Sequence, residues 1–269
     1  MNFYGLFGKT LGHSISPQIH KKIYEGTGIK AAYKNFEINE DQLEGALNAM
    51  QILGINGANV TIPYKEDFLP LLDAISPLAE RLHSVNTIKN NEGTFIGYNT
   101  DYDGIALTFD LMKWKVKDKK TYILGSGGAS HAIAHYFKDQ EAASVTIVSR
   151  TPSKSTGDWE FIDYKELENR EGDFIVNCTP VGMYPNIDAS PVNEDILNRF
   201  NYLFDMTYNP AETKFLKIGN QLGKETVNGL DMLVGQAMRS VEIWEDFKIS
   251  PEDQLEILTY FQESWKGAK

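Results

Sequence analysis

Four short polar motifs near the start of the chain carry the side chains best suited to chemistry on a small polar ligand. They are residues 12–17 (GHSISP), 57–65 (GANVTIPYK), 84–87 (SVNT) and 97–101 (GYNTD). All four are expected at the C-terminal ends of predicted strands, which is where ligands bind in open α/β sheets. Hydroxyl, amide, ammonium and carboxylate groups are therefore expected to gather at one edge of a sheet.

Each motif has an ordinary alternative explanation when it is taken alone. Ser14 and Ser16 lie beside a predicted helix start, where two hydroxyls can hold a carboxylate, although Ser16 can also simply cap the helix. Asn59 and Thr61 alternate along a strand end and share a face. Lys65 follows a proline that interrupts the strand, and a lone lysine is usually a surface residue. The combination, rather than any one member, indicates a site.

A glycine-rich loop marks a second candidate site. The strand YILG leads into residues 125–130 (GSGGAS), and a helical pattern follows. Glycines at such a turn let backbone N–H groups approach a pyrophosphate at the helix N-terminus. Ser130 stands where the dinucleotide fingerprint has its third glycine, and an ordinary strand-to-helix turn is the alternative.

Basic residues follow the next predicted strand, about 20 residues after the loop. This strand ends at Ser149-Arg150-Thr151, and Lys154 comes shortly afterwards. An NAD site usually has an acidic residue there, whereas a basic residue suits the 2′-phosphate of NADP. A solvated basic turn is the alternative. The stretch 151–158 is loop-like where a Rossmann unit usually has a crossover helix, so that helix is expected to be short or missing.

Strand-like and helix-like segments alternate along the chain, which predicts an α/β fold with parallel sheets covered by helices. The predicted strands are residues 3–8, 31–38, 55–60, 119–125, 143–150, 173–177 and 202–206. The predicted helices are residues 16–28, 39–54, 102–112, 131–137, 228–247 and 251–265.

Composition limits the classes of partner and site. The formal net charge of −11 argues against nucleic acid or an anionic membrane as the main partner. The one cysteine, Cys178, leaves no intrachain disulfide, and no signal-peptide core or long apolar segment is visible, so we expect a soluble cytoplasmic protein. His131 and His135 lack the glutamate of a zinc-binding H-E-x-x-H motif, so no metal site is expected.

Taken in order, the motifs resemble the shikimate dehydrogenase family across essentially the whole chain. The matching segments are H-S-x-S-P-x-x-H at 13–20, N-V-T-x-P-x-K at 59–65, V-N-T at 85–87, N-T-D-x-x-G at 99–104, the glycine loop, Arg150-Thr151, N-x-T-x-x-G-M at 177–183, D-x-x-Y-x-P-x-x-T at 205–213 and G-x-x-M-L-x-x-Q at 229–236. Departures are modest: the family's N-R-T is Ser149-Arg150-Thr151 here, and its G-A-G-G-A is GSGGA.

The resemblance implies a two-domain α/β fold with the active site in the cleft between the domains. An N-terminal substrate domain would comprise residues 1–101 plus the returning C-terminal helices at 238–269, and a Rossmann-like NADP domain would comprise residues 102–237. By carry-over, Lys65 and Asp101 form the catalytic pair. The residues implied to contact shikimate are Ser14, Ser16, Asn59, Thr61, Asn86, Tyr208 and Gln236. Those implied to lie along NADP are Gly125, Ser126, Gly127, Gly128, Ala129, Ser130, Arg150, Thr151, Lys154, Met206 and Gly229.

The implied activity is the reversible, NADP-dependent reduction of 3-dehydroshikimate to shikimate in aromatic amino acid (chorismate) biosynthesis. Lys65 would donate a proton to the developing alkoxide, Asp101 would orient the ammonium, and no metal would be required. Two alternatives stay open: a quinate/shikimate dehydrogenase of relaxed specificity, and a non-catalytic sensor of shikimate-pathway ligands. A sensor has no need of the proton relay that Lys65 and Asp101 would form. A monomer or a homodimer is expected.

Overall fold

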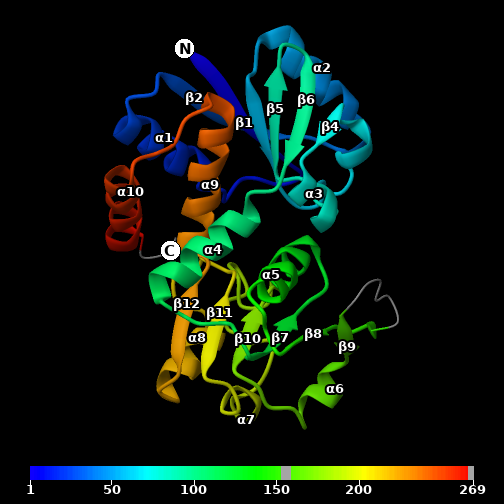
Figure 1. Cartoon of the computed structure of the whole chain (residues 1–269), viewed down its shortest axis with the longest axis vertical. Helices are drawn as coiled ribbons and strands as arrows, with labels where there is room; N and C mark the ends of the chain where they lie inside the picture. The colour runs from blue at the N-terminus through cyan, green and yellow to red at the C-terminus, as the bar shows by residue number, and fades with distance from the viewer. Residues whose placement is uncertain (153–158, 266–269) are drawn as a thin grey trace. The chain divides into compact units, whose positions relative to one another are not determined.

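The computed structural model describes residues 1–152 and 159–265, which divide into two compact units (Figure 1). The first unit comprises Met1–Gly104 and Val234–Tyr260, and the second comprises Ile105–Leu233 together with the chain from Phe261 onward. The sequence-based division assigned the whole C-terminal segment from residue 238 to the first domain. The end of the last helix instead groups with the second unit.

The first unit is built on a mixed sheet, with the strand order β2-β1-β3-β5-β6-β4. Its strands are β1 (Asn2–Gly8), β2 (Ala31–Glu37), β3 (Gly57–Val60), β4 (Ala74–Ile75), β5 (Thr87–Asn91) and β6 (Thr94–Tyr98). The strand β5 runs antiparallel to both of its neighbours, so the prediction of parallel sheets throughout was wrong for this unit. Glu92 and Gly93 join β5 to β6 with positive φ angles of 53° and 92°, a conformation typical of tight hairpin turns.

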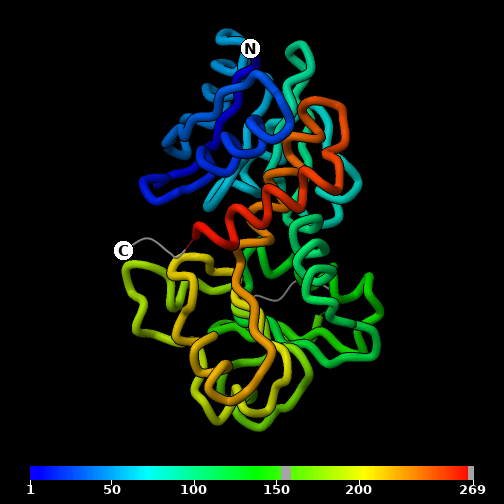
Figure 2. The backbone as a smooth tube through the Cα atoms, turned by 90° about the vertical axis from the view of Figure 1, so that its left-hand side faces the viewer, coloured from blue at the N-terminus to red at the C-terminus, as the bar shows by residue number. Residues whose placement is uncertain are grey.

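Helices from both ends of the chain belong to the first unit. They are α1 (Ser16–Thr27), α2 (Leu43–Leu53) after the 3₁₀ turn η1 (Glu40–Gln42), α3 (Pro77–Leu82), and most of α9 (Leu230–Glu245) and α10 (Pro251–Ser264). A short 3₁₀ turn, η2 (Leu69–Leu71), lies between β3 and β4. Figure 2 shows the C-terminal segment beside N-terminal elements, and Lys22 of α1 pairs with Glu256 of α10 at 2.9 Å.

The side chain of Trp244 anchors α9 to the sheet of the first unit. Its ring stacks on Tyr4 at 4.4 Å, and its indole N–H donates to the carbonyl of Ile88 at 2.9 Å. A Cβ atom at Gly57 would lie 2.3 Å from the indole nitrogen, so β3 needs a glycine there. The expected return of the C-terminal helices is therefore confirmed for α9 and most of α10. The chain from Phe261 to Trp265 groups with the second unit, where the Trp265 indole N–H donates to the carbonyl of Tyr208.

The second unit has an entirely parallel sheet with the order β12-β11-β10-β7-β8-β9. Its strands are β7 (Lys120–Leu124), β8 (Ser144–Val148), β9 (Glu160–Ile162), β10 (Phe174–Asn177), β11 (Tyr202–Asp205) and β12 (Glu225–Asn228). The helices are α5 (Gly128–Asp139), α6 (Tyr164–Leu167), α7 (Glu194–Leu197) and α8 (Lys214–Gln221), and most of α4 (Asp101–Met112). When β7 to β12 are numbered 1 to 6 along the chain, the order across the sheet from β9 is 3-2-1-4-5-6. This is the strand order of a dinucleotide-binding Rossmann fold.

The sequence predicts a short or missing helix after β8. The expected shortening of the helix after β8 falls mainly on residues 153–158, outside the described residues. Within the described parts of the chain, no helix is both long enough and apolar enough to cross a membrane.

Candidate active site

Lys65 and Asp101 form a close ion pair in the first unit. The Lys65 Nζ atom lies 2.5 Å from Asp101 Oδ2, and the two side chains are only 17% and 7% exposed. Lys65 lies on the loop after β3, and Asp101 is the first residue of α4, which begins three residues after the last residue of β6. Both strands run in the same direction, so their C-terminal ends meet at one edge of the sheet. The predicted catalytic pair is thus brought together by the fold.

Asn86 holds the carboxylate of Asp101 from the other side. Its Nδ2 atom donates to Asp101 Oδ1 at 2.9 Å, while its Oδ1 accepts from the backbone N–H of Thr100 at 2.8 Å. The Asp101 backbone N–H donates to Asn99 Oδ1 at 3.0 Å. Asn86 precedes the antiparallel strand β5, so its motif lies at a strand start and not at the predicted C-terminal end. It still reaches the same edge because β5 runs in the opposite direction.

Ser14 and Ser16 lie together at the start of α1. Their Oγ atoms are 3.1 Å apart, and the Ser14 hydroxyl also accepts from the Ser16 backbone N–H at 3.3 Å. The residue in the N-cap position is Ile15, with no side-chain capping bond, so Ser16 is a helical residue and not the predicted cap. Both serines are half-buried. Two hydroxyls beside a helix N-terminus suit a carboxylate ligand.

The remaining predicted substrate residues differ in how closely they approach the pair. Gln236 Oε1 is 3.5 Å from Asn86 Nδ2 and 3.4 Å from the Thr100 hydroxyl. Thr61 follows β3 and is half-buried. Tyr208 belongs to the second unit, where its ring lies 5.9 Å from that of Trp265.

Asn59 is the predicted contact residue whose surroundings differ most from expectation. It is 5% exposed, and its Oδ1 accepts from the Tyr33 hydroxyl at 2.8 Å. Its Nδ2 lies within hydrogen-bond distance of the Asn86 carbonyl at 3.1 Å and of the Ser240 hydroxyl at 2.9 Å. The polar atoms of Asn59 are thus engaged inside the protein.

Sequence reasoning missed Tyr33 and Ser240 as members of this network. Ser240 lies four residues after Gln236 on α9, so helical spacing from that predicted site residue could have indicated it. Tyr33 lies on β2 and has no comparable signal. His20, the last residue of the first family motif, stacks on Tyr33 with ring centres 3.8 Å apart. Burial lowers the pKa of His20 to about 3.

The glycine loop of the second unit has the geometry that a dinucleotide site needs. Gly125 follows β7 with a φ of 103°, and a Cβ there would lie 3.1 Å from the Thr179 side chain. Gly127 is the N-cap of α5, whose first turn contains no acidic residue. A Cβ at Gly127 would meet no described atom within 4 Å, so there is room beside the helix start. The first amides of a helix lack intrahelical partners and suit a pyrophosphate. The loop therefore fits the cofactor that the sequence predicts.

Arg150 and Thr151 are exposed just beyond β8, beside this loop. The Ser149 hydroxyl accepts from the Thr151 backbone N–H at 3.3 Å and lies 3.4 Å from the Ser126 hydroxyl, which joins the two segments. No carboxylate occupies the Ser149–Thr151 turn where an NAD site usually has one. Lys154 lies outside the described residues.

Met206 and Gly229 come together at the ends of β11 and β12. A Cβ at Gly229 would lie 2.1 Å from the Met206 carbonyl oxygen, so only glycine fits this approach. The Cys178 Sγ lies 3.0 Å from the Met206 Sδ, and burial raises the pKa of the Cys178 thiol. This agrees with a structural rather than a nucleophilic role for the cysteine.

A buried carboxylate, Asp205, ties the end of β11 to its neighbours. It accepts from the Thr213 hydroxyl at 2.6 Å, from the Thr207 backbone N–H at 3.0 Å and from Asn177 Nδ2 at 3.1 Å. Burial raises its pKa to about 6. Asp205 thus fixes the loop that carries Met206.

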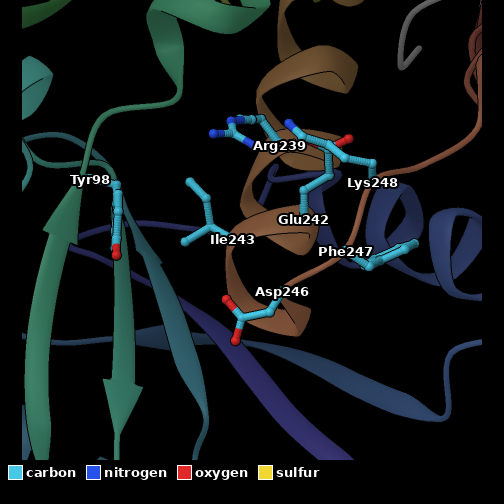
Figure 3. A pocket seen from close by; sticks show the side chains of 7 residues that line it. All are labelled: Tyr98, Arg239, Glu242, Ile243, Asp246, Phe247 and Lys248. Atoms are coloured by element: carbon cyan, nitrogen blue, oxygen red, sulfur yellow. Dashed lines mark hydrogen bonds and ion pairs between the residues drawn. The ribbon is translucent and has the colours of Figure 1, made fainter.

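A surface pocket of about 390 Å³ lies elsewhere on the first unit, between the end of β6 and α9 (Figure 3). Its lining residues are Tyr98, Arg239, Glu242, Ile243, Asp246, Phe247 and Lys248. Arg239 and Lys248 each pair with Glu242 at 2.9 Å, so these charges already compensate one another. None of the predicted site residues that the structure describes lines this pocket.

Comparison with known proteins identifies the family of the chain. Residues 6–88 match the family model of the shikimate dehydrogenase substrate binding domain. A shikimate dehydrogenase (NADP(+)) of Clostridium beijerinckii is 40% identical over 270 residues, covering 99% of this chain and 100% of that protein. The crystal structure of shikimate dehydrogenase 1 from Peptoclostridium difficile is 47% identical, with a TM-score of 0.92 over 99% of this chain and all of the other. The Thermus thermophilus shikimate 5-dehydrogenase, solved in complex with NADP(H) and shikimate, is 28% identical, with a TM-score of 0.87 over 97% of this chain and 99% of that one. The chain therefore belongs to the shikimate dehydrogenase family.

Proposed function

We propose that the chain is an NADP-dependent shikimate dehydrogenase that reversibly reduces 3-dehydroshikimate to shikimate in aromatic amino acid biosynthesis. The observation that carries this proposal is the 2.5 Å pair of Lys65 and Asp101 at the edge of the first sheet, in a chain of this family. The resemblance to dehydrogenases named for NADP supplies the cofactor. We place the enzyme in the cytoplasm, as a monomer or homodimer.

The proton of the reaction is assigned to Lys65. Bound NADPH supplies the hydride for the ketone carbon of the substrate. The Lys65 ammonium donates a proton to the oxygen that becomes negative, and the neutral amine takes it back in the reverse direction. Asp101 accepts from Lys65 and from Asn86, which fixes the ammonium in one direction. Asp101 is also available to accept a hydrogen bond from a substrate hydroxyl.

The substrate is held by polar side chains around this pair. Ser14 and Ser16 bind the carboxylate of shikimate at the start of α1, with Tyr208 as a further donor. Thr61, Asn86 and Gln236 contact the ring hydroxyls. Asn59 was predicted as another contact, and we assign it a different role below, because its polar atoms are engaged within the protein.

The cofactor is held by backbone groups and a guanidinium. The glycine loop and the start of α5 bind the pyrophosphate, and Arg150 pairs with the 2′-phosphate. Thr151, Met206 and Gly229 line the remainder, and Lys154 stays a predicted phosphate contact.

The test is to mix purified protein with shikimate and NADP and follow NADPH by absorbance. We expect turnover with NADP and much less with NAD. Quinate should react roughly ten- to a hundredfold less efficiently, because its carboxylate leaves a saturated ring carbon at a different angle. Binding of shikimate without turnover would indicate a sensor. Quinate as efficient as shikimate would indicate a dehydrogenase of relaxed specificity.

A further inference from the structure

We propose that Ser240 on α9 is a positioning residue for the catalytic pair. A buried group of hydrogen bonds around its hydroxyl sets the orientation of the Asn86 amide, and this amide holds Asp101 beside Lys65. The inference rests on the proposed function, since it concerns the residues assigned to proton transfer. It also explains why Asn59 is occupied inside the protein.

The hydroxyl of Ser240 lies at the centre of the buried group. The side chain has no exposed surface, and its Oγ donates to the Gln236 carbonyl at 2.9 Å. The same oxygen lies 2.8 Å from the Thr87 hydroxyl, 2.9 Å from Asn59 Nδ2 and 3.3 Å from the Thr100 hydroxyl. The single Ser240 hydrogen is shared between the Gln236 carbonyl and the Thr87 hydroxyl, which leaves the Thr87 hydrogen for Asn86 Oδ1, and the two Ser240 lone pairs accept from Asn59 Nδ2 and the Thr100 hydroxyl. The Ser240 hydroxyl, on a helix near the C-terminal end of the chain, thus lies within hydrogen-bond distance of side chains on β3, β5 and the turn before α4.

Thr87 and Asn59 connect this acceptor to Asn86. The Thr87 hydroxyl lies 3.1 Å from Asn86 Oδ1, and Asn59 Nδ2 donates to the Asn86 backbone carbonyl at 3.1 Å. Without the Ser240 hydroxyl, a donor such as the Asn59 side-chain amide would be buried without its hydrogen-bond acceptor. Buried polar groups rearrange to avoid this, and the neighbours available for rearrangement are those that hold Asn86.

The orientation of the Asn86 amide decides what Asp101 faces. The backbone N–H of Thr100 can only donate, so the Asn86 atom 2.8 Å from it must be oxygen. The amide nitrogen therefore points at Asp101 Oδ1, 2.9 Å away, and donates to it. A turned amide would set an oxygen against the carboxylate and weaken the position of Asp101 beside Lys65. Ser240 acts on the pair through this amide.

The test compares Ser240→Ala with variants that separate positioning from packing. Thr87→Val removes the hydroxyl that links Ser240 to Asn86 while keeping the side-chain shape. Ser240→Thr keeps the hydroxyl. Ser84→Ala is the matched control, because Ser84 is 1% exposed and its hydroxyl has no hydrogen-bond partner among the described residues.

Two measurements are made on each full-length variant. The first is the pH profile of kcat/KM for shikimate oxidation, whose shape does not depend on the fraction of folded enzyme. The second is hydrogen–deuterium exchange of the Asn86 side-chain amide by NMR, which does not depend on activity.

We expect Ser240→Ala and Thr87→Val to lower kcat by about tenfold, to move the acidic limb of the profile by about half a pH unit or more, and to speed Asn86 amide exchange. Ser240→Thr should restore the profile, and Ser84→Ala should match the unmodified enzyme. An unchanged profile and unchanged exchange in both Ser240→Ala and Thr87→Val would overturn the inference. If the exchange results hold but the unmodified protein does not oxidise shikimate, the positioning network stands and the proposed function fails.

Discussion

The two candidate sites of this chain differ in the groups that form them. In the first unit, Lys65, Asp101 and Asn86 are side chains from separate segments, fixed by a buried network with distances between 2.5 and 3.5 Å. In the second unit, the site at residues 125–130 consists mainly of backbone at a helix start, with Arg150 exposed beside it. The first site is preorganised for a small ligand, whereas the second offers room and charge to a long one.

This difference predicts how substitutions in each site affect function and folding. A buried polar network loses its function when one member is removed, because the other members are left with unsatisfied groups. A backbone site keeps its fold after most side-chain changes and is damaged where an added atom fills the ligand's space. Substitutions in the first unit should therefore affect catalysis, and those in the second should affect cofactor affinity with little change in folding.

The largest effect is expected for Lys65→Ala. Removing the proton donor should lower kcat by about a thousandfold, within the range usual for general acid–base catalysis. Shikimate affinity should change only a few-fold, because hydroxyls and amides hold the ring. The measurement is steady-state kinetics together with calorimetric titration of shikimate.

Lys22→Ala is the matched control for Lys65→Ala. Lys22 also pairs with a carboxylate, that of Glu256, at 2.9 Å, and its side chain is 20% exposed, but it is not one of the predicted site residues. It should keep normal turnover. Near-normal turnover of Lys65→Ala at neutral pH would remove Lys65 from the mechanism.

The second prediction uses one buried titratable group in each unit, with opposite effects of pH. Burial lowers the pKa of His20 to about 3 from 6.5, so below pH 6.5 unfolding takes up a proton and the first unit loses stability as pH falls. Burial raises the pKa of Asp205 to about 6 from 3.8. Between these two pH values Asp205 is protonated in the folded state and ionised in the unfolded state. The contribution of this protonation difference to the stability of the second unit is complete below pH 3.8 and is lost as the pH rises through 6. Each effect amounts to about 1.4 kcal/mol per pH unit within its window.

Variants that cannot titrate isolate these two effects. His20→Phe keeps the aromatic stack on Tyr33, and Asp205→Asn keeps a group that can bond to Thr213. Hydrogen exchange measured in each unit between pH 4.5 and 6.5 should show that His20→Phe removes an acid-induced loss in the first unit. Asp205→Asn should remove a loss in the second unit as pH rises. The same pH slope in both units of the unmodified protein would contradict the comparison.

The third prediction concerns the charge beside the glycine loop. Arg150→Ala should lower kcat/KM with NADP by roughly ten- to a hundredfold, since a charge-assisted contact with phosphate is worth about 1.5–3 kcal/mol. Efficiency with NAD should stay the same, because NAD has no 2′-phosphate. Arg170→Ala is the control: Arg170 is also in the second unit, where it pairs with Glu160 at 3.0 Å. An equal loss with both cofactors would assign Arg150 a structural role instead.

Sequence patterns predicted the sheet of the second unit more completely than that of the first. A strand, a glycine turn and a helix are local in sequence, and the apolar runs at residues 173–177 and 202–206 indicated buried parallel strands. In the first unit, the hairpin of β5 and β6 was missed, because both strands are short and the first of them, TIKNN, is polar. The prediction of parallel sheets throughout failed for this reason.

The site residues of the first unit were predictable by type but not by role. Lys65 and Asp101 are 36 residues apart, and their motifs indicated a common sheet edge before any distance was known. The hydrogen bond between Asn59 and Ser240 spans 181 residues, and no local pattern indicates which of two polar groups faces a ligand and which faces the protein. That distinction depends on burial, which only the folded structure supplies.

The smallest effect is expected for Gly127→Ala, which tests whether the second site is limited by space. Gly127 has an ordinary φ of −88°, and an added Cβ would meet no described atom within 4 Å, so the variant should fold with unchanged stability. The new methyl group would lie at the start of α5, where the pyrophosphate is proposed to bind, and NADP affinity should fall about tenfold, or roughly 1.4 kcal/mol.

Gly45→Ala in α2 is the control, since a Cβ there also meets no described atom within 4 Å. Alanine within a helix should stabilise that variant by about 0.5–1 kcal/mol without changing NADP affinity. Fluorescence titration with NADP and thermal unfolding of both variants separate the two quantities. If Gly127→Ala binds NADP as tightly as the unmodified protein, the space beside α5 is not where the cofactor lies. If it loses stability instead, the glycine is required by the fold and the contrast between the two sites is weaker than proposed.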